Sequence, residues 1–286
     1  MIKALVFGAT GHLGSEMVAA LKSKNFFTTA VVRSRPDNSF PENDVDDFRI
    51  SPLSSSDDFK GICAGYDLVI SALGKSVSPF DRSKRSFRQV DLEINKKILE
   101  DALQNKVKKF VYVSALDAEK YPDLEYFAVH QEMANLVALS GIDYTIVKPP
   151  ALFSAFIDLM KMAAKGQLVN MGKGEMKTNP ISERDLARIV VDSLAEKNYV
   201  LAAGGPEVLT RKRINEIIQE NINPAKKIRT VPMGLVRSML PLIKIFDRNS
   251  FDKIAFFTEV MMHDTIAPIA GSETLQQYVN RKKHLP

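Results

Sequence analysis

The sequence has 286 residues, 45% of them hydrophobic and 26% charged, with 14 glycines and 14 prolines. This composition is typical of a globular protein and excludes a disordered or fibrous chain. The formal net charge of +5 could indicate an anionic partner. Except at residues 82–85 and 282–283, however, the basic residues are scattered, and they lack interleaved aromatic residues, so we expect no nucleic-acid partner.

Cysteine content and apolar runs indicate the compartment. The single cysteine, Cys63, cannot form an internal disulfide and has no second cysteine or clustered histidine nearby, so we expect a reducing environment and no bound metal. The apolar run 2–7 is too short for the core of a signal peptide. The run 233–246 is broken by glycine, proline and charged residues, so it does not predict a spanning helix. We therefore expect a cytoplasmic protein with no membrane partner.

The first half of the chain alternates short β-branched runs with longer amphipathic segments, which is typical of βαβ units. Strands are predicted at residues 2–7, 28–33, 47–50, 68–72, 110–114 and 144–148. The clearest helices are predicted at residues 11–24, 86–105 and 123–140. Because crossovers between parallel strands are right-handed, this order predicts an α/β fold with a doubly wound, parallel Rossmann sheet and helices on both faces.

After Pro149 and Pro150 the alternation becomes looser. Helices are predicted at residues 153–165 and 183–194, with extended pieces around residues 179–181 and 199–203. We expect a small C-terminal helical substrate lobe over the carboxyl ends of the strands, where α/β proteins bind ligands. With no internal repeat or clean linker, the sequence predicts one domain over residues 1–286. Residues 1–150 would form its dinucleotide-binding core, and about residues 151–286 would add the last strands and the substrate lobe.

A glycine-rich loop follows the first predicted strand and opens the first predicted helix, with the sequence Gly8-Ala9-Thr10-Gly11-His12-Leu13-Gly14. This context is the one that a dinucleotide-binding loop requires. Gly8 would permit the tight turn, Gly11 the approach of the pyrophosphate, and Gly14 the close packing of helix on strand. The helix N terminus would offer unpaired N–H groups to the phosphates. We therefore predict that this loop binds a dinucleotide; the alternative is a glycine turn needed only for packing.

Two arginines follow the second predicted strand, where NAD-binding proteins commonly place an acidic residue on the adenosine ribose. Arg33 stands at its end and Arg35 two residues later. A guanidinium can pair with a 2′-phosphate, which a carboxylate would repel. The sequence therefore favours NADP(H), unless the arginines are only solvated loop residues. Asp37, the nearest acid, keeps NAD(H) possible.

Four motifs in this order resemble those of the atypical short-chain dehydrogenase/reductases, and in particular their NmrA-like, NAD(P)H-binding branch. They are the loop 8–14, Leu68-Val69-Ile70-Ser71-Ala72-Leu73-Gly74, Phe110-Val111-Tyr112-Val113-Ser114 and Ser140-Gly141-Ile142-Asp143-Tyr144-Thr145-Ile146-Val147-Lys148-Pro149. The resemblance covers about residues 1–200 and fades beyond about residue 205.

The resemblance implies further cofactor neighbours at the ends of two strands. They are Ser71, Ala72, Leu73, Gly74, Lys148, Pro149 and Pro150. For Ser71 the alternative is a buried hydroxyl satisfied by the backbone. Lys148 replaces the family's usual arginine, which leaves a backbone role but not a bidentate one. Pro52 stands near the place where many relatives have an aspartate for the adenine.

The resemblance also implies a catalytic site at Ser114, Tyr126 and His130. The family protonates the developing alkoxide with a tyrosine whose pKa a nearby lysine lowers, and a serine fixes the substrate oxygen. Tyr126 follows Ser114 by twelve positions, a familiar separation, but His130 stands where the lysine of Tyr-x-x-x-Lys would be. His130 could itself be the acid or a substrate contact. The alternative is that Tyr126 packs a helix and His130 lies on the surface.

Three functions follow from these observations. The first is an NADPH-dependent reductase of a small apolar carbonyl or alkene, an oxidoreductase whose lobe forms an apolar pocket. The residues considered for that pocket, which could equally be core, are Phe153, Phe156, Met160, Met162, Met239, Phe256, Phe257, Met261 and Met262. The second is a non-catalytic dinucleotide sensor that binds a partner protein, as some NmrA-like proteins do. The third is an epimerase or isomerase that keeps its cofactor bound.

Overall fold

The computed structural model describes residues 1–34 and 45–283, and the chain divides into two compact units. Unit 1 consists of residues 1–75, 85–148 and 186–201, and unit 2 of residues 76–84, 149–185 and 202 onward. The expectation of a single domain stays a prediction.

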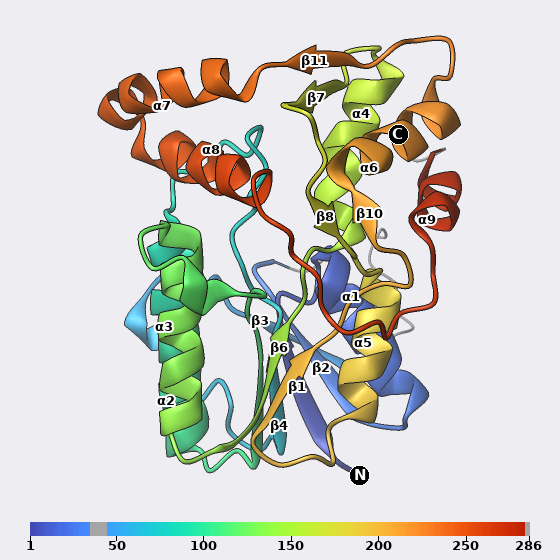
Figure 1. The fold of residues 1–286 in the computed structure, drawn as a ribbon. Helices are drawn as coiled ribbons and strands as arrows, with labels where there is room; N and C mark the ends of the chain where they lie inside the picture. The colour runs from blue at the N-terminus through green and yellow to red at the C-terminus, as the bar shows by residue number, and fades with distance from the viewer. Residues whose placement is uncertain (35–44, 284–286) are drawn as a thin grey trace. The chain divides into compact units, whose positions relative to one another are not determined.

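A seven-stranded sheet with the order β3-β2-β1-β4-β5-β6-β9 forms the centre of unit 1 (Figure 1). Its strands are β1 (Lys3–Phe7), β2 (Phe27–Val32), β3 (Asp47–Ile50), β4 (Leu68–Ser71), β5 (Lys109–Val113), β6 (Asp143–Lys148) and β9 (Tyr199–Ala202). The strands from β3 to β6 pair in parallel. The first six strands form within one residue of the predicted bounds, so the predicted doubly wound Rossmann sheet is confirmed.

Helices cover both faces of this sheet. Figure 1 shows α2 (Asn95–Gln104) and α3 (Glu125–Leu139) on one side, and α1 (His12–Ser23) and α5 (Glu183–Asp192) on the other. The central strands are accordingly buried, and all four residues of β4 are inaccessible, as expected for a parallel sheet covered on both sides. The strand order reverses between β1 and β4, and α/β proteins bind ligands in the crevice at such a switch point.

The helix predicted over residues 86–105 differs from the structure in its first half. Residues Arg88–Ile94 form a π-helix that continues into α2. Asp91, Leu92 and Ile94 of this π-helix are buried, as is Asn95 at the start of α2. Insertions of π-helix are rare and occur mostly at functional sites.

Unit 2 contains five helices and two small sheets within its described residues. The helices are α4 (Ile157–Ala164), α6 (Arg211–Ile222), α7 (Met233–Phe246), α8 (Arg248–Val260) and α9 (Leu275–Lys282). Strand β8 (Lys177–Thr178) pairs with β10 (Leu209–Thr210) in antiparallel fashion, and β7 (Val169–Met171) pairs with β11 (Arg229–Val231) in parallel. Short 3₁₀ turns lie at Ser56–Phe59 and Ala118–Lys120 in unit 1 and at Phe153–Phe156 in unit 2. Within the described ranges, every helix is too short or too polar to cross a membrane.

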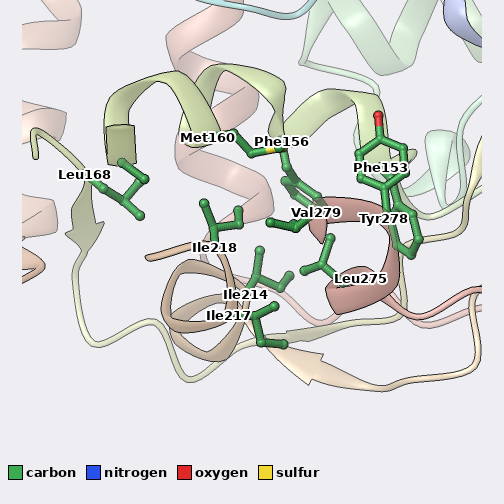
Figure 2. Close-up of a cluster of buried hydrophobic side chains, with 11 residues drawn as sticks. Phe153, Phe156, Met160, Leu168, Ile214, Ile217, Ile218, Leu275, Tyr278 and Val279 are labelled. Atoms are coloured by element: carbon green, nitrogen blue, oxygen red, sulfur yellow. The ribbon is translucent and has the colours of Figure 1, made fainter. Parts of the chain in front are cut away.

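The core of unit 2 lies between α4, α6 and α9 (Figure 2). Phe153, Phe156 and Met160 are at most 8% exposed and pack there, with the Phe153 ring centroid 5.1 Å from that of Tyr278. These three residues, considered for an apolar substrate pocket, are therefore core. Met162 is partly buried against the same cluster.

Candidate functional site

The turn after β1 requires glycine at two of its three glycine positions. Gly8 has a φ of +73°, and a Cβ there would lie 2.7 Å from the carbonyl oxygen of Ala72 and 2.9 Å from the nitrogen of Leu73. A Cβ on Gly14 would lie 2.0 Å from the carbonyl oxygen of Gly8. Any side chain at either position would therefore force backbone apart. Ala72 and Leu73, two predicted cofactor neighbours, also lie directly against the loop.

Gly11 differs from these two glycines because the backbone conformation of the turn does not require a glycine there. Its φ is −78°, and a Cβ would meet only the carbonyl oxygen of Gly8, at 3.2 Å. Its N–H donates to that same oxygen at 2.9 Å and closes the turn. Thr10, Gly11 and His12 are exposed, whereas Leu13 is buried. A glycine that the fold hardly demands, on the open side of the turn, fits a surface that a ligand approaches closely.

The N terminus of α1 is also suited to an anion. Gly11 is its N-cap, no side chain caps the helix, and no acidic residue lies in its first turn. The first-turn N–H groups and the positive end of the helix dipole are thus not neutralised by a side chain. Together with the open face at Gly11, this arrangement fits the phosphates of a dinucleotide.

The predicted contacts to the adenosine end are partly described. Arg33 is exposed and directly follows β2, which pairs in parallel with β1. It therefore leaves the sheet at the same edge as the glycine loop. Arg35 and Asp37 lie outside the described residues.

The remaining predicted cofactor neighbours lie at the ends of β4 and β6, and two of them, Ser71 and Lys148, have side-chain partners within the protein. Ser71 is 1% exposed and donates a hydrogen bond from its hydroxyl to Oδ1 of Asn95. Gly74 is exposed, and a Cβ there would lie 2.9 Å from Oδ1 of Asp91. Lys148 ends β6 and its Nζ lies 3.0 Å from Oε2 of Glu119. Pro149 and Pro150 follow as the first residues of that segment of unit 2.

The three predicted catalytic residues lie together. The hydroxyl of Ser114 donates to the carbonyl oxygen of His130 at 3.4 Å, and the Tyr126 ring stands edge-on to the His130 ring with centroids 4.6 Å apart. His130 is 6% exposed, so the alternative that placed it on the surface is wrong. Tyr126 is half-buried and also packs edge-on against Phe87, with centroids 5.4 Å apart.

Two further polar residues, not predicted for the site, complete a buried cluster around His130. The Tyr112 hydroxyl lies 2.9 Å from Nδ1 of His130, with the donor set by the imidazole tautomer. Oδ1 of Asp91 lies 3.6 Å from Nε2 of His130. Asp91 also accepts from the backbone N–H of Lys75, at 3.1 Å to Oδ1. The signal that could have found Asp91 is an acidic residue within the apolar stripe of a predicted helix.

Burial sets the protonation of this cluster. It lowers the pKa of His130 to about 4 and raises the pKa of Asp91 to about 8, although the Lys75 N–H bond opposes the second shift. Burial also raises the pKa of Tyr126, and the Asp91 charge raises it further. At neutral pH His130 is therefore neutral and Tyr126 keeps its proton. No ammonium at position 130 lowers the tyrosine pKa, unlike in the family's Tyr-x-x-x-Lys arrangement.

Comparison with known proteins identifies the family. The sequence profile of the family described as NAD(P)H-binding matches residues 8–197. The divinyl chlorophyllide a 8-vinyl-reductase of Cucumis sativus is 28% identical over 260 residues, covering 81% of this chain and 60% of that protein. The chain thus spans about three fifths of the length of that relative. Photosystem II assembly factor Ycf39 of Synechocystis is 22% identical over 263 residues, covering 89% of this chain and 79% of that protein.

A solved structure shows the same fold over nearly the whole chain. The NADPH-dependent quinone oxidoreductase of Escherichia coli in complex with NADPH superposes with a TM-score of 0.70 and 16% identity, covering 97% of this chain and 99% of that chain. The profile match covers most of the chain and begins at the glycine loop. The chain therefore belongs to the NAD(P)H-binding family, as its resemblance to the NmrA-like, atypical short-chain dehydrogenase/reductases implied.

Proposed function

We propose that this protein is an NADP(H)-dependent reductase of a small apolar acceptor in which the reducible bond, an alkene or a carbonyl, is conjugated. The observation that carries the proposal is the buried His130, which stands where the family has its lysine and contacts both Ser114 and Tyr126. Both His130, which is neutral, and Tyr126, which keeps its proton, can donate hydrogen bonds. Without a positive charge at position 130, however, the pKa of Tyr126 is not lowered as it is in the family's Tyr-x-x-x-Lys arrangement.

The bound dinucleotide would supply the hydride, and the protein must hold the acceptor and provide one proton. Hydride addition to a simple ketone leaves a localised alkoxide, which depends strongly on a well-placed acid. Addition to a conjugated acceptor leaves a delocalised anion that needs less help from an acid. The Tyr126 hydroxyl would donate to the oxygen that carries this charge, and Ser114 would help to position it.

For the cofactor we propose a preference for NADP(H) over NAD(H). Arg33 is exposed at the sheet edge that carries the glycine loop, and its guanidinium would pair with the 2′-phosphate. Gly8 to Gly14 would hold the pyrophosphate, with the end of β4 and Lys148 beside the nicotinamide half. We expect the whole chain to act on a small-molecule substrate in the cytoplasm.

Relatives support the reaction class rather than a particular substrate. One relative is a vinyl reductase and one protein of the same fold is a quinone oxidoreductase. A vinyl group attached to a conjugated ring and a quinone are both conjugated acceptors. Because the chain spans only part of the vinyl reductase and is only 16% identical to the quinone oxidoreductase, neither substrate is assigned to it.

A substrate panel tests the proposal. NADPH oxidation is followed with quinones and α,β-unsaturated carbonyls in one set and with simple ketones and aldehydes in the other. We expect turnover in the first set that exceeds turnover in the second at least tenfold. The Gly11→Val variant, which should not bind the dinucleotide, is the control for reduction by contaminants. Faster turnover of simple ketones would contradict the reasoning from the cluster.

A second function, a dinucleotide sensor that binds a partner protein, has its own support. The same neutral His130 fits a site that binds the cofactor without turning it over, and one relative is an assembly factor. Tight NADPH binding with no turnover across both sets of acceptors would favour the sensor over the reductase.

A further inference from the structure

Helix α7 of unit 2 exposes a stripe of large apolar side chains, formed by Leu235, Leu242, Ile245 and Phe246. They are 58%, 61%, 77% and 86% exposed. Leu242, Ile245 and Phe246 follow Leu235 by seven, ten and eleven residues, and these separations place all four on one side of an α-helix. Val236 and Ile243, on another side of α7, are half-buried, and α7 packs against α8 (Figure 1). The stripe is thus not the face that closes the core, and a large exposed apolar patch indicates an interaction surface.

Positive charge is concentrated in the segment that leads into α7 and contains it. Residues 225–248 contain six basic residues and one acidic residue, a net charge of +5 that equals the formal charge of the whole chain. Lys226, Lys227, Arg229, Arg237 and Lys244 are exposed. Over the part of the chain that is described, none of these five side chains forms an ion pair with an acidic residue, although Arg248 does so with Asp252. The rest of the molecule is neutral on balance.

A hollow of about 460 Å³ adjoins the N-terminal end of α7. Its lining includes Pro232, which is the N-cap of α7, together with Lys173, Lys212 and the buried Asn170. Oδ1 of Asn170 accepts a hydrogen bond from Asn215 at 2.8 Å, so its amide nitrogen is the group left to donate. Lys212 also pairs with Glu216 at 3.7 Å. Two ammonium groups and an amide donor fit an oxoanion such as a phosphate group.

We propose that α7 and the basic residues of segment 225–248 bind the surface of an anionic lipid bilayer. The stripe would enter the boundary between headgroups and acyl chains, the lysines and arginines would reach the anionic headgroups, and the hollow would accept a headgroup phosphate. Two copies of this surface would repel each other, which argues against a dimer through the stripe. With 14 residues α7 is too short to span the hydrocarbon core, so the association is peripheral. It would replace the sequence-based expectation of no membrane partner.

Vesicle sedimentation with the full chain tests this surface. We expect binding to vesicles of equimolar phosphatidylcholine and phosphatidylglycerol, weakening as salt is added, and little binding to phosphatidylcholine alone. Changing both Leu242→Ser and Phe246→Ser should weaken binding more than tenfold. Changing Lys226→Gln and Lys227→Gln should weaken it by roughly fivefold for each charge.

Matched controls make the same chemical changes elsewhere. Leu139→Ser removes an apolar side chain that is 86% exposed on α3, and Lys197→Gln removes an exposed charge; neither should alter vesicle binding. All variants should keep the circular dichroism and NADPH affinity of the original, which shows that they are folded.

Four results would overturn the proposal. They are equal binding to neutral and anionic vesicles, no binding to either, controls that weaken binding as much as the α7 variants, and a dimer in light scattering that Phe246→Ser dissociates. Retention on immobilised polyglutamate without any vesicle binding would assign the surface to an acidic protein instead.

Discussion

Substituting the glycines of the cofactor loop one at a time should separate folding from binding. At Gly14 an added methyl would lie 2.0 Å from the carbonyl oxygen of Gly8, and both positions are backbone, so rotation of a side chain cannot relieve the overlap. Overpacking of this kind costs about 1 to 3 kcal/mol and occasionally more. The higher helix propensity of alanine relative to glycine offsets up to about 1 kcal/mol of this cost. We expect Gly14→Ala to lower the free energy of unfolding by about 2 kcal/mol.

Gly11→Ala is the matched variant, because its methyl meets a single atom at 3.2 Å and its φ is ordinary. Its free energy of unfolding should stay within about 0.5 kcal/mol of the original, whereas its NADPH affinity should fall at least tenfold because the methyl stands where the pyrophosphate approaches. Urea unfolding measures the first quantity and titration calorimetry the second. The reasoning is refuted if Gly14→Ala is as stable as the original chain, or if Gly11→Ala binds NADPH unchanged.

Three other predictions concern charge and protons. Arg33→Gln should remove most of the preference for NADPH over NADH, a difference on the order of 1.5 to 3 kcal/mol for a charge-assisted pair; equal affinities in the unaltered chain would exclude this role. Tyr126→Phe should lower carbonyl turnover by roughly 10²- to 10⁴-fold, quinone turnover by less, and leave NADPH affinity unchanged in steady-state and binding assays. The raised pKa of Asp91, about 8, means that the folded state holds a proton that the unfolded state has already lost, so stability should fall as pH rises from about 6.5 to 8. His130 acts in the opposite direction, because its pKa falls from 6.5 to about 4 on folding, and its rise in stability with pH lies mainly below this window. Asp91→Asn should remove most of this fall in stability between about pH 6.5 and 8. Urea unfolding at the two pH values measures it, and an equal fall in the variant would contradict the role of Asp91.

The strands and the cofactor loop could be predicted because their signals are local. Most of the strands are short runs rich in apolar and β-branched residues, and the glycine spacing lies within the seven residues of one turn. The cluster around His130 could not be predicted in this way. It joins Asp91 of the π-helix, Tyr112 of β5 and His130 of α3, and these residues become neighbours only after the sheet has formed. Sequence spacing placed Tyr126 and His130 on one face of a helix but said nothing of the groups that bury them. The opposite directions of the His130 and Asp91 shifts follow from burial, which periodicity cannot quantify.

The close contact between Gly8 and residues 72–73 makes the loop and the end of β4 a single mechanical element. The Ala72 N–H donates to the Phe7 carbonyl at 3.1 Å, and there is no room between Gly8 and this backbone for a methyl group. We expect a dinucleotide that stiffens the turn to stiffen also the chain leading to Gly74 and Lys75, whose N–H donates to the carboxyl of Asp91. Occupancy of the phosphate site would in this way reach the cluster around His130 through the backbone of residues 72–75 and the Asp91 carboxyl, and slowed hydrogen exchange at the Ala72 amide would be its signature.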